Sequence, residues 1–346
     1  MSQLGEVLTT ARRARGLTQA ELAELAGVTQ AALSRYEADL RSPDPEVIER
    51  LAVVLGVTSS LLVRGGQLRG AMAVDAHMRR RATAKATVWR QLEAQLNMYR
   101  LHAHALFEHV SLRAEQTVPV FDPLETDPAD AARLVRMQWK VPVGPVRSLV
   151  GWLEAAGCLV IEDDFETGRV DGLSQWVEDK AVIYLNRRSP TDRKRLTLAH
   201  ELAHLCLHAD TISDDPEGDA NRFAAELLMP ATLIRPQLRN LTVGRLSDLK
   251  REWMVSMQAL IERAHELRTL RQGQRTNLYR RFSANGWRTR EPASDELPPE
   301  HPRLPGEIGD MLARTGLSSD EIDKMAGFEG GANNPFRRLR GALWAV

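Results

Sequence analysis

The chain has few cysteines and no long apolar run. Its 346 residues include two cysteines, Cys158 and Cys206, which are too few for a disulfide framework and favour a reducing, intracellular compartment. The stretch from Met1 to Glu6 has no apolar core of the kind found in a secretion signal. No segment reaches the roughly 18 apolar residues that a membrane span needs. The sequence therefore predicts a soluble, cytoplasmic protein with no membrane partner.

The chain also has no net charge, since 46 Lys and Arg balance 46 Asp and Glu. This balance argues against a uniformly basic coat for nucleic acids, although one small DNA-binding module is still compatible with it. The length favours two or more domains. We expect four consecutive segments: short helices in 1–65, a helical connector in 66–124, an α+β domain in 125–292, and a proline-rich linker with a short helical segment in 293–346.

Residues 1–65 predict short helices separated by tight turns. Thr18 is a good N-cap for a helix over 19–25, and Thr29 caps the next helix, over 30–37. The turn between the two helices contains a glycine. Two short helices around such a turn are typical of a helix-turn-helix.

The runs Leu17–Val28 and Leu33–Glu37 resemble the Cro/C1-type (XRE) family of DNA-binding domains. The resemblance implies that the second helix enters the major groove of a double-stranded DNA operator. The residues that would face DNA are Gln19, Gln30, Ala31, Ser34 and Arg35. Because a single copy binds weakly, a homodimer is expected. The alternative is a helical interaction module without affinity for DNA.

The run from His200 to His204, His-Glu-Leu-Ala-His, is the clearest indication of a catalytic or metal-binding site in the sequence. Residues four apart lie on one face of an α-helix, so the two histidines can close on a single zinc ion. Glu201 comes off the same side and can reach a metal-bound water, as in zinc peptidases. A catalytic zinc site needs a third protein ligand and an open position for water.

The third ligand is expected on the next helix. Glu217 lies near its start, 13 residues after His204, and Asn221 follows one turn later. That spacing suits an amide that orients a ligand imidazole. Asp219 is the rival third ligand. We expect His208 to support the site by hydrogen bonding, because a fourth protein ligand would close it.

These residues, together with the run Ala220–Pro230, resemble the ImmA/IrrE metallo-endopeptidase family. The resemblance covers about residues 125–292. It implies a multidomain protein, in which an all-α helix-turn-helix domain precedes an α+β, zincin-like metallopeptidase domain with a helical C-terminal extension. It also implies a set of site residues: His200, His204 and Glu217 as zinc ligands, and Glu201 as the general base.

Taken together, the two resemblances point to the fused XRE–ImmA/IrrE regulators of bacteria and phages. They imply a DNA-binding transcriptional regulator that carries a zinc-dependent endopeptidase. Its protein substrate would be an XRE-type repressor, or the chain itself, cut in a stress or mobile-element response. The alternative is a transcription factor whose metal-bound, peptidase-like domain is a non-catalytic sensory or interaction module. Glu201 favours catalysis, because a purely structural zinc site has no need of that carboxylate.

Overall fold

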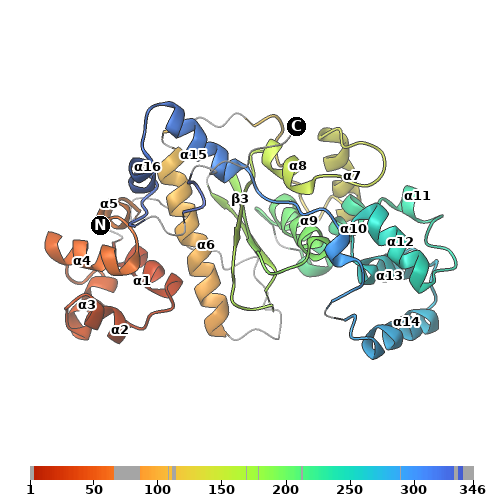
Figure 1. Ribbon diagram of the computed structural model, residues 1–346, viewed down its shortest axis with the longest axis horizontal. Helices are drawn as coiled ribbons and strands as arrows, with labels where there is room; N and C mark the ends of the chain where they lie inside the picture. The colour runs from red at the N-terminus through yellow and green to blue at the C-terminus, as the bar shows by residue number, and fades with distance from the viewer. Residues whose placement is uncertain are drawn as a thin grey trace. The chain divides into compact units, whose positions relative to one another are not determined.

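The computed structural model describes the following residues: 4–65, 86–107, 109–110, 114–168, 170–177, 179–211, 213–288, 290–330 and 334–337. The chain divides into two compact units, of which the first combines 1–113 with 303–346 and the second is 114–302 (Figure 1). Residues 66–85 of the expected connector lie outside the described part. None of the helices in that part combines the length and hydropathy needed to cross a bilayer.

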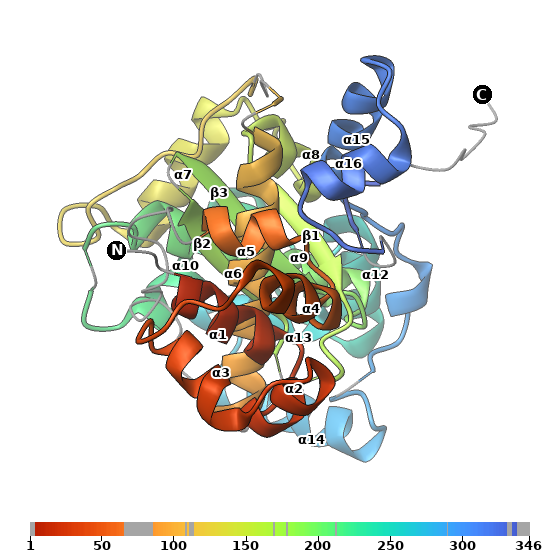
Figure 2. The same cartoon turned by 90° about the vertical axis from the view of Figure 1, so that its left-hand side faces the viewer.

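The N-terminal part of the first unit consists of short helices (Figure 2). They are α1 (Leu4–Ala14), α2 (Gln19–Leu25), α3 (Gln30–Glu37), α4 (Pro45–Leu55) and α5 (Ser59–Gly65). Side-chain caps fix the boundaries: Thr18 and Glu21 form a reciprocal capping box at α2, and the hydroxyl of Thr29 accepts a hydrogen bond from the Ala32 N–H at α3. The helices predicted over 19–25 and 30–37 are therefore confirmed.

A compact apolar core and one buried ion pair hold these helices together. Leu8, Leu22 and Leu33 are at most 1% exposed. The guanidinium of Arg12 donates to both carboxylate oxygens of Glu37, from Nε at 2.6 Å and from Nη2 at 2.9 Å. Such a bidentate pair also fixes orientation, so it ties the end of α1 to the end of α3.

The described part of the first unit also contains α6 (Ala86–Phe107), α15 (Leu304–Arg314) and α16 (Ser319–Met325). Met98 and Leu101 of α6 enter the core that α1 to α5 form. α6, which lies in the expected helical connector, buries apolar side chains against α1 and so belongs to the first compact unit.

The second unit contains a three-stranded sheet of β1 (Leu159–Asp163), β2 (Gly172–Val177) and β3 (Lys180–Asn186). The strand order is β1-β3-β2, with β1 parallel and β2 antiparallel to β3. Val182, Ile183 and Leu185 on the central strand are fully buried. Burial of successive residues shows that both faces of the strand are covered, which matches its continuous apolar sequence.

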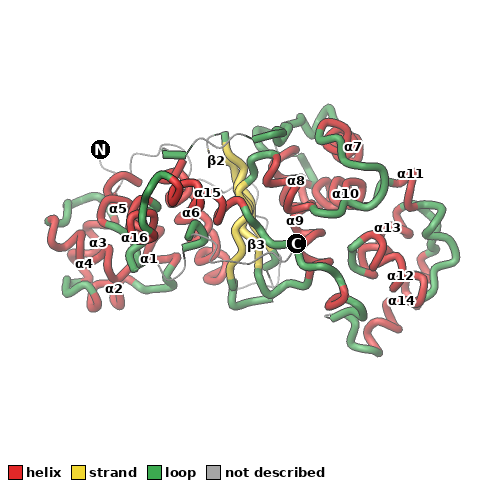
Figure 3. Tube along the Cα trace, turned by 45° about the horizontal axis from the view of Figure 1, so that its top comes forward, coloured by secondary structure: helices red, strands yellow, loops and turns green. Residues whose placement is uncertain are grey.

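Helices surround this sheet. They are α7 (Pro128–Gln138), α8 (Leu149–Ala155), α9 (Thr191–Leu207), α10 (Pro216–Leu228), α11 (Ala231–Ile234), α12 (Val243–Trp253), α13 (Met257–Glu266), α14 (Gln272–Ala284) and the short 3-10 helix η1 (Ser294–Glu296). α9 packs on β2 and β3, and α10 runs beside α9. Figure 3 shows α12 to α14 beyond α9 and α10 as seen from the sheet. The predicted multidomain α+β architecture is confirmed.

A buried ion cluster anchors the start of α9. The ammonium of Lys250 on α12 is fully buried and donates to Asp192, to Glu291 Oε2 at 2.8 Å and to Ser294 Oγ at 2.8 Å. Glu291 also accepts the Met257 N–H at the start of α13. The expected linker after residue 293 therefore begins as a packed segment, because Ser294 and Glu291 satisfy a buried charge.

Candidate metal centre

Three side chains from α9 and α10 meet at one point. His200 and His204 are one helical turn apart on α9, and their Nε2 atoms lie 3.1 Å from each other. Glu217, in the first turn of α10, places Oε2 3.5 Å from Nε2 of His200 and Oε1 3.5 Å from Nε2 of His204. Among the residues that the structure describes, these three form the group of ligand-type atoms that could hold a metal ion.

The spacing of these atoms fits a zinc ion. Ligands about 2.0–2.2 Å from a tetrahedral zinc ion lie roughly 3.4 Å from one another. The separations of 3.1 Å between the two Nε2 atoms and 3.5 Å from each of them to its nearer Glu217 oxygen are close to this value, and one ligand atom from each residue lies within 4.8 Å of the other two. Two imidazoles and one carboxylate are a donor set that catalytic zinc sites use, with the fourth position open.

Two further predicted residues support the imidazoles. Asn221, one turn after Glu217, places Oδ1 3.1 Å from Nδ1 of His200. An Nδ1–H that donates to this oxygen leaves Nε2 as the ligand atom. The Nδ1 atoms of His208 and His204 lie 3.0 Å apart. The structure therefore brings both supporting residues to the ligand histidines that the spacing indicated.

Of the two rivals for the third ligand position, Glu217 lies in the group and Asp219 lies outside it. The carboxylate of Asp219 accepts hydrogen bonds from Ser213 and Arg222. Its Oδ2 lies 3.8 Å from Nε2 of His208. Asp219 therefore faces a supporting histidine rather than the ligand atoms.

Glu201 is held from the sheet side. Its side chain is buried, and its Oε2 accepts a hydrogen bond of 2.7 Å from the hydroxyl of Ser174 on β2. The strand comes close at Gly172, where a Cβ atom would lie 2.6 Å from Thr197 Cγ2 and 3.4 Å from Glu201 Cγ. Sequence reasoning missed Ser174, because no spacing along the chain relates a strand residue to a helix residue 27 positions later.

α3 presents most of the predicted DNA-facing residues to solvent. The exposed ones are Gln30, Ala31, Ser34 and Arg35. Leu33 and Tyr36, on the same helix, are buried. Gln19 is placed differently, since its side-chain amide donates to Glu37 Oε2 at 2.8 Å. The exposed face of α3 is therefore polar and available, whereas Gln19 is engaged within the domain.

Comparison with protein families gives one match for the N-terminal helices and another for the region of the metal centre. A model of the helix-turn-helix family matches residues 8–62, and a model of the IrrE N-terminal-like domain matches residues 153–265. The protein joins a helix-turn-helix domain to an IrrE N-terminal-like domain. The second match spans α9 and α10, and so contains the whole candidate metal centre.

One relative of the helix-turn-helix domain is YonR, an SPbeta prophage-derived HTH-type transcriptional regulator of Bacillus subtilis (strain 168). The two chains are 31% identical over 61 residues, which are 18% of this chain and 56% of YonR. The match thus spans just over half of the relative's length, and it supports the assignment of the N-terminal domain.

Hydrogen bonds and charge set the protonation of the IrrE-like site. Hydrogen bonds from His200 and His204 hold the pKa of Glu217 far below its usual value. Burial opposes protonation of His200, but the hydrogen bond to Glu217 and the charges of Glu201 and Glu217 outweigh it and raise the pKa of His200. Because a metal ion must displace protons from its imidazole ligands, binding is expected to strengthen as pH rises.

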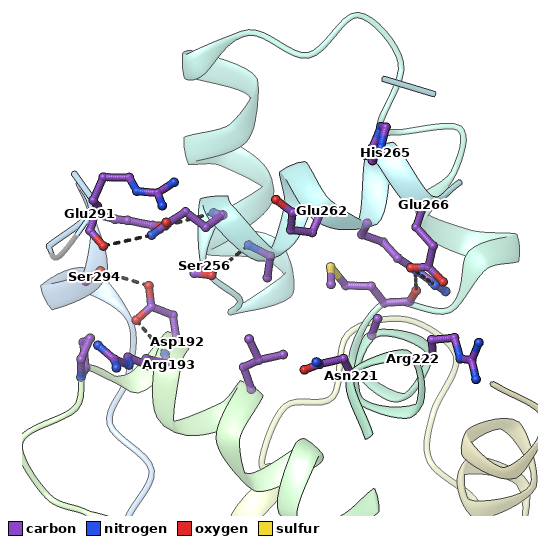
Figure 4. A pocket seen from close by; sticks show the side chains of 18 residues that line it. Asp192, Arg193, Asn221, Arg222, Ser256, Glu262, His265, Glu266, Glu291 and Ser294 are labelled. Carbon is purple, nitrogen blue, oxygen red and sulfur yellow. Dashed lines mark hydrogen bonds and ion pairs between the residues drawn. The ribbon is translucent and has the colours of Figure 1, made fainter. Parts of the chain in front are cut away.

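A cavity of about 680 Å³ in the IrrE-like domain is lined by residues of α9, α10 and α13. Asn221, which contacts His200, also lines this cavity. Figure 4 shows Asn221 and Arg222 on one side, and Glu262 and Glu266 of α13 on the other. The ligand residues His200, His204 and Glu217 do not line this cavity, so Asn221 is the residue that links it to the ligand group.

Proposed function

We propose that this protein is a DNA-binding transcriptional regulator whose IrrE-like domain is a zinc-dependent endopeptidase. The observation that carries the proposal is that His200, His204 and Glu217 converge while Ser174 holds Glu201 beside them. Zinc bound to this group supplies a Lewis acid for a peptide carbonyl and lowers the pKa of water. A purely structural site would more typically use four protein ligands.

Glu201 acts as the general base. It accepts the proton that the attacking water loses, and it returns this proton to the leaving amide nitrogen. The hydrogen bond from Ser174 restricts the rotamer of this carboxylate. Its negative charge also acts on His200, which places the base within electrostatic reach of the ligand group.

The helix-turn-helix domain suggests the substrate. A DNA-bound peptidase meets other proteins that occupy the same operators, so we propose a Cro/C1-type repressor as the substrate, with the chain itself as the second target. Cleavage would remove repression in a stress or mobile-element response. A prophage-derived regulator among the relatives of the N-terminal domain supports the mobile-element setting.

Zinc-loaded, full-length protein is expected to cut a purified Cro/C1-type repressor at a small number of bonds, which mass spectrometry of the fragments would identify. Removal of the metal with a chelator should stop cleavage, and added zinc should restore it. The protein incubated alone tests self-cleavage. If a chain that carries one zinc leaves every neighbouring repressor and itself intact, the non-catalytic sensory module becomes the better explanation.

For DNA binding, we propose that the exposed face of α3 reads the operator. Arg35→Ala is expected to weaken binding to the selected operator by about 5- to 150-fold, equivalent to about 1–3 kcal/mol. Operators can be selected from random duplexes, and affinity measured by fluorescence anisotropy at one salt concentration. If the selected DNA site is palindromic, its two-fold symmetry would indicate that the protein binds as the expected homodimer.

The control is Arg64→Ala, which removes an exposed arginine from α5 in the same domain. This variant should bind nearly as well as the wild type. An equal loss in both variants would mean that arginine charge alone drives binding, and it would contradict sequence reading by α3.

A further inference from the structure

The last two helices repeat the first two. α1 and α15 cover Leu4–Ala14 and Leu304–Arg314, and α2 and α16 cover Gln19–Leu25 and Ser319–Met325. Both pairs have the same lengths and the same numbering offset of 300. Neither family match extends to residues beyond 265, so nothing in those matches accounts for α15 and α16.

The sequences of the two turns agree as well. Residues 316–328 share five of thirteen positions with residues 16–28, namely Gly316, Leu317, Glu321, Ala326 and Gly327. Conservative pairs stand at several others, such as Ile322 for Leu22. The shared residues are those that a helix-turn-helix needs for caps, tight turns and core.

The hydrogen bonds of the second copy follow those of the first. Ser318 and Glu321 form a capping box, as Thr18 and Glu21 do. The N–H of Phe328 donates to the carbonyl of Asp323 at 2.8 Å, and the N–H of Val28 donates to that of Ala23 at 2.9 Å. Gly27 and Gly327 both have positive φ. The repeat is therefore one of local structure as well as of sequence.

The second copy has lost the residues suited to DNA. The exposed arginines at 13 and 15 correspond to Ala313 and Thr315. The positions of Gln30 and Arg35 correspond to Gly330 and Pro335, which disfavour a helix. The described residues 334–337 accordingly form a turn where α3 has a helix. The counterpart of the DNA-reading helix is therefore absent from this part of the copy.

The second copy has gained contacts with the first. The N–H of Thr58 donates to the carbonyl of Gly327 at 2.9 Å, and the N–H of Glu329 donates to that of Gly56 at 3.1 Å. These bonds flank an isolated antiparallel bridge between Val57 and Phe328. The turn that ends α16 therefore pairs with the turn between α4 and α5.

α6 also contacts the turn that ends α16. The imidazole of His102 stacks on Phe328, with ring centroids 3.8 Å apart, and its Nδ1 lies 2.6 Å from the carbonyl oxygen of Ala326. Burial lowers the pKa of His102 to about 4, so the ring is neutral near pH 7 and its Nδ1–H can donate to that oxygen. Figures 1 and 2 show α15 and α16 at the opposite end of this unit from α2 and α3.

We propose that residues 304–330 are a second copy of the opening of the helix-turn-helix domain, which no longer reads DNA and serves as an internal docking module. Its partner in the same chain is formed by the α4–α5 turn of the helix-turn-helix domain and by α6. The shared positions include those that form caps, turns and core, and the changed positions include Gln30 and Arg35 of the DNA-facing set. This pattern fits a module that keeps its fold without reading DNA.

Two glycines offer a matched test. Gly327 and Gly330 both have positive φ, but a Cβ at Gly327 would lie 2.8 Å from a methyl carbon of Leu61, and one at Gly330 would meet nothing within 4 Å. In the full-length protein, Gly327→Ala should increase hydrogen exchange at the Thr58 amide by about tenfold or more, because docking protects it. Gly330→Ala carries similar backbone strain and should leave Thr58 protected.

The peptide that covers α3 serves as an internal reference and should keep its protection in both variants. If Gly327→Ala unfolds the whole unit, His102→Asn tests the same contact more gently, and it should also speed exchange at Thr58. Unchanged exchange at Thr58 in both variants would overturn docking. Cross-linking of the full-length protein to a random-sequence DNA duplex should label α3, and labelling of 319–335 would overturn the loss of DNA reading.

Discussion

Glu201→Gln is expected to lower the rate of repressor cleavage by about 10²–10⁴-fold while the zinc content stays unchanged. Glutamine has the same size, and its amide oxygen can still accept the hydrogen bond that Ser174 donates. It cannot take up a proton, so the general-base step is lost while the three ligand side chains remain. Cleavage should be measured by fragment appearance over time, and zinc by mass spectrometry of the purified protein.

The matched control is Ser174→Ala, which removes the hydroxyl that orients Glu201 but leaves the carboxylate in place. A smaller loss of rate is expected, with zinc content again unchanged. Cleavage by Glu201→Gln at the wild-type rate would show that the carboxylate is not the base, and it would remove the main reason to regard the domain as an enzyme.

Glu217→Ala is expected to weaken zinc binding by more than about 100-fold, because loss of a residue that merely supports a ligand already costs about 10- to 100-fold. The carboxylate of Glu217 lies 3.5 Å from the Nε2 atoms of both histidines, so alanine leaves a site with two protein ligands. Competition with a chromophoric chelator would give the affinity of each variant.

Asp219→Ala is the appropriate comparison, since Asp219 is the rival acid two positions later on the same helix. It should retain zinc with a much smaller change in affinity, because its carboxylate contacts Ser213, Arg222 and His208 instead of the ligand nitrogens. The opposite result, with zinc kept by Glu217→Ala and lost by Asp219→Ala, would exchange the roles of the two acids.

The sequence predicted those parts of the site that depend on one helix at a time. His200 and His204 lie one turn apart on any helix, and so do Glu217 and Asn221. The start of α2 was also predictable, because Thr18 and Glu21 cap it through bonds that span three residues. In each case the relative position of the residues follows from the geometry of a single helix or of its first turn.

What depends on packing between distant segments was not predictable in the same way. The choice between Glu217 and Asp219 rests on the angle at which α10 crosses α9, and the contact between Ser174 and Glu201 rests on how β2 lies against α9. Assignment of α6 to the first unit likewise depends on which partner its apolar side chains find. The repeat of α1 and α2 was visible in the sequence as a constant offset of 300, but most of its positions have diverged.

The division of the first unit between the two ends of the chain affects the order of events during synthesis. Residues 303–337 leave the ribosome after the whole of 114–302, and at about 5–20 residues per second this delays them by roughly 10 to 50 s relative to α5. The second unit can therefore fold before α15 and α16 are made. Each newly made chain passes through a stage in which α1 to α6 are present but the segment that covers the α4–α5 turn is not.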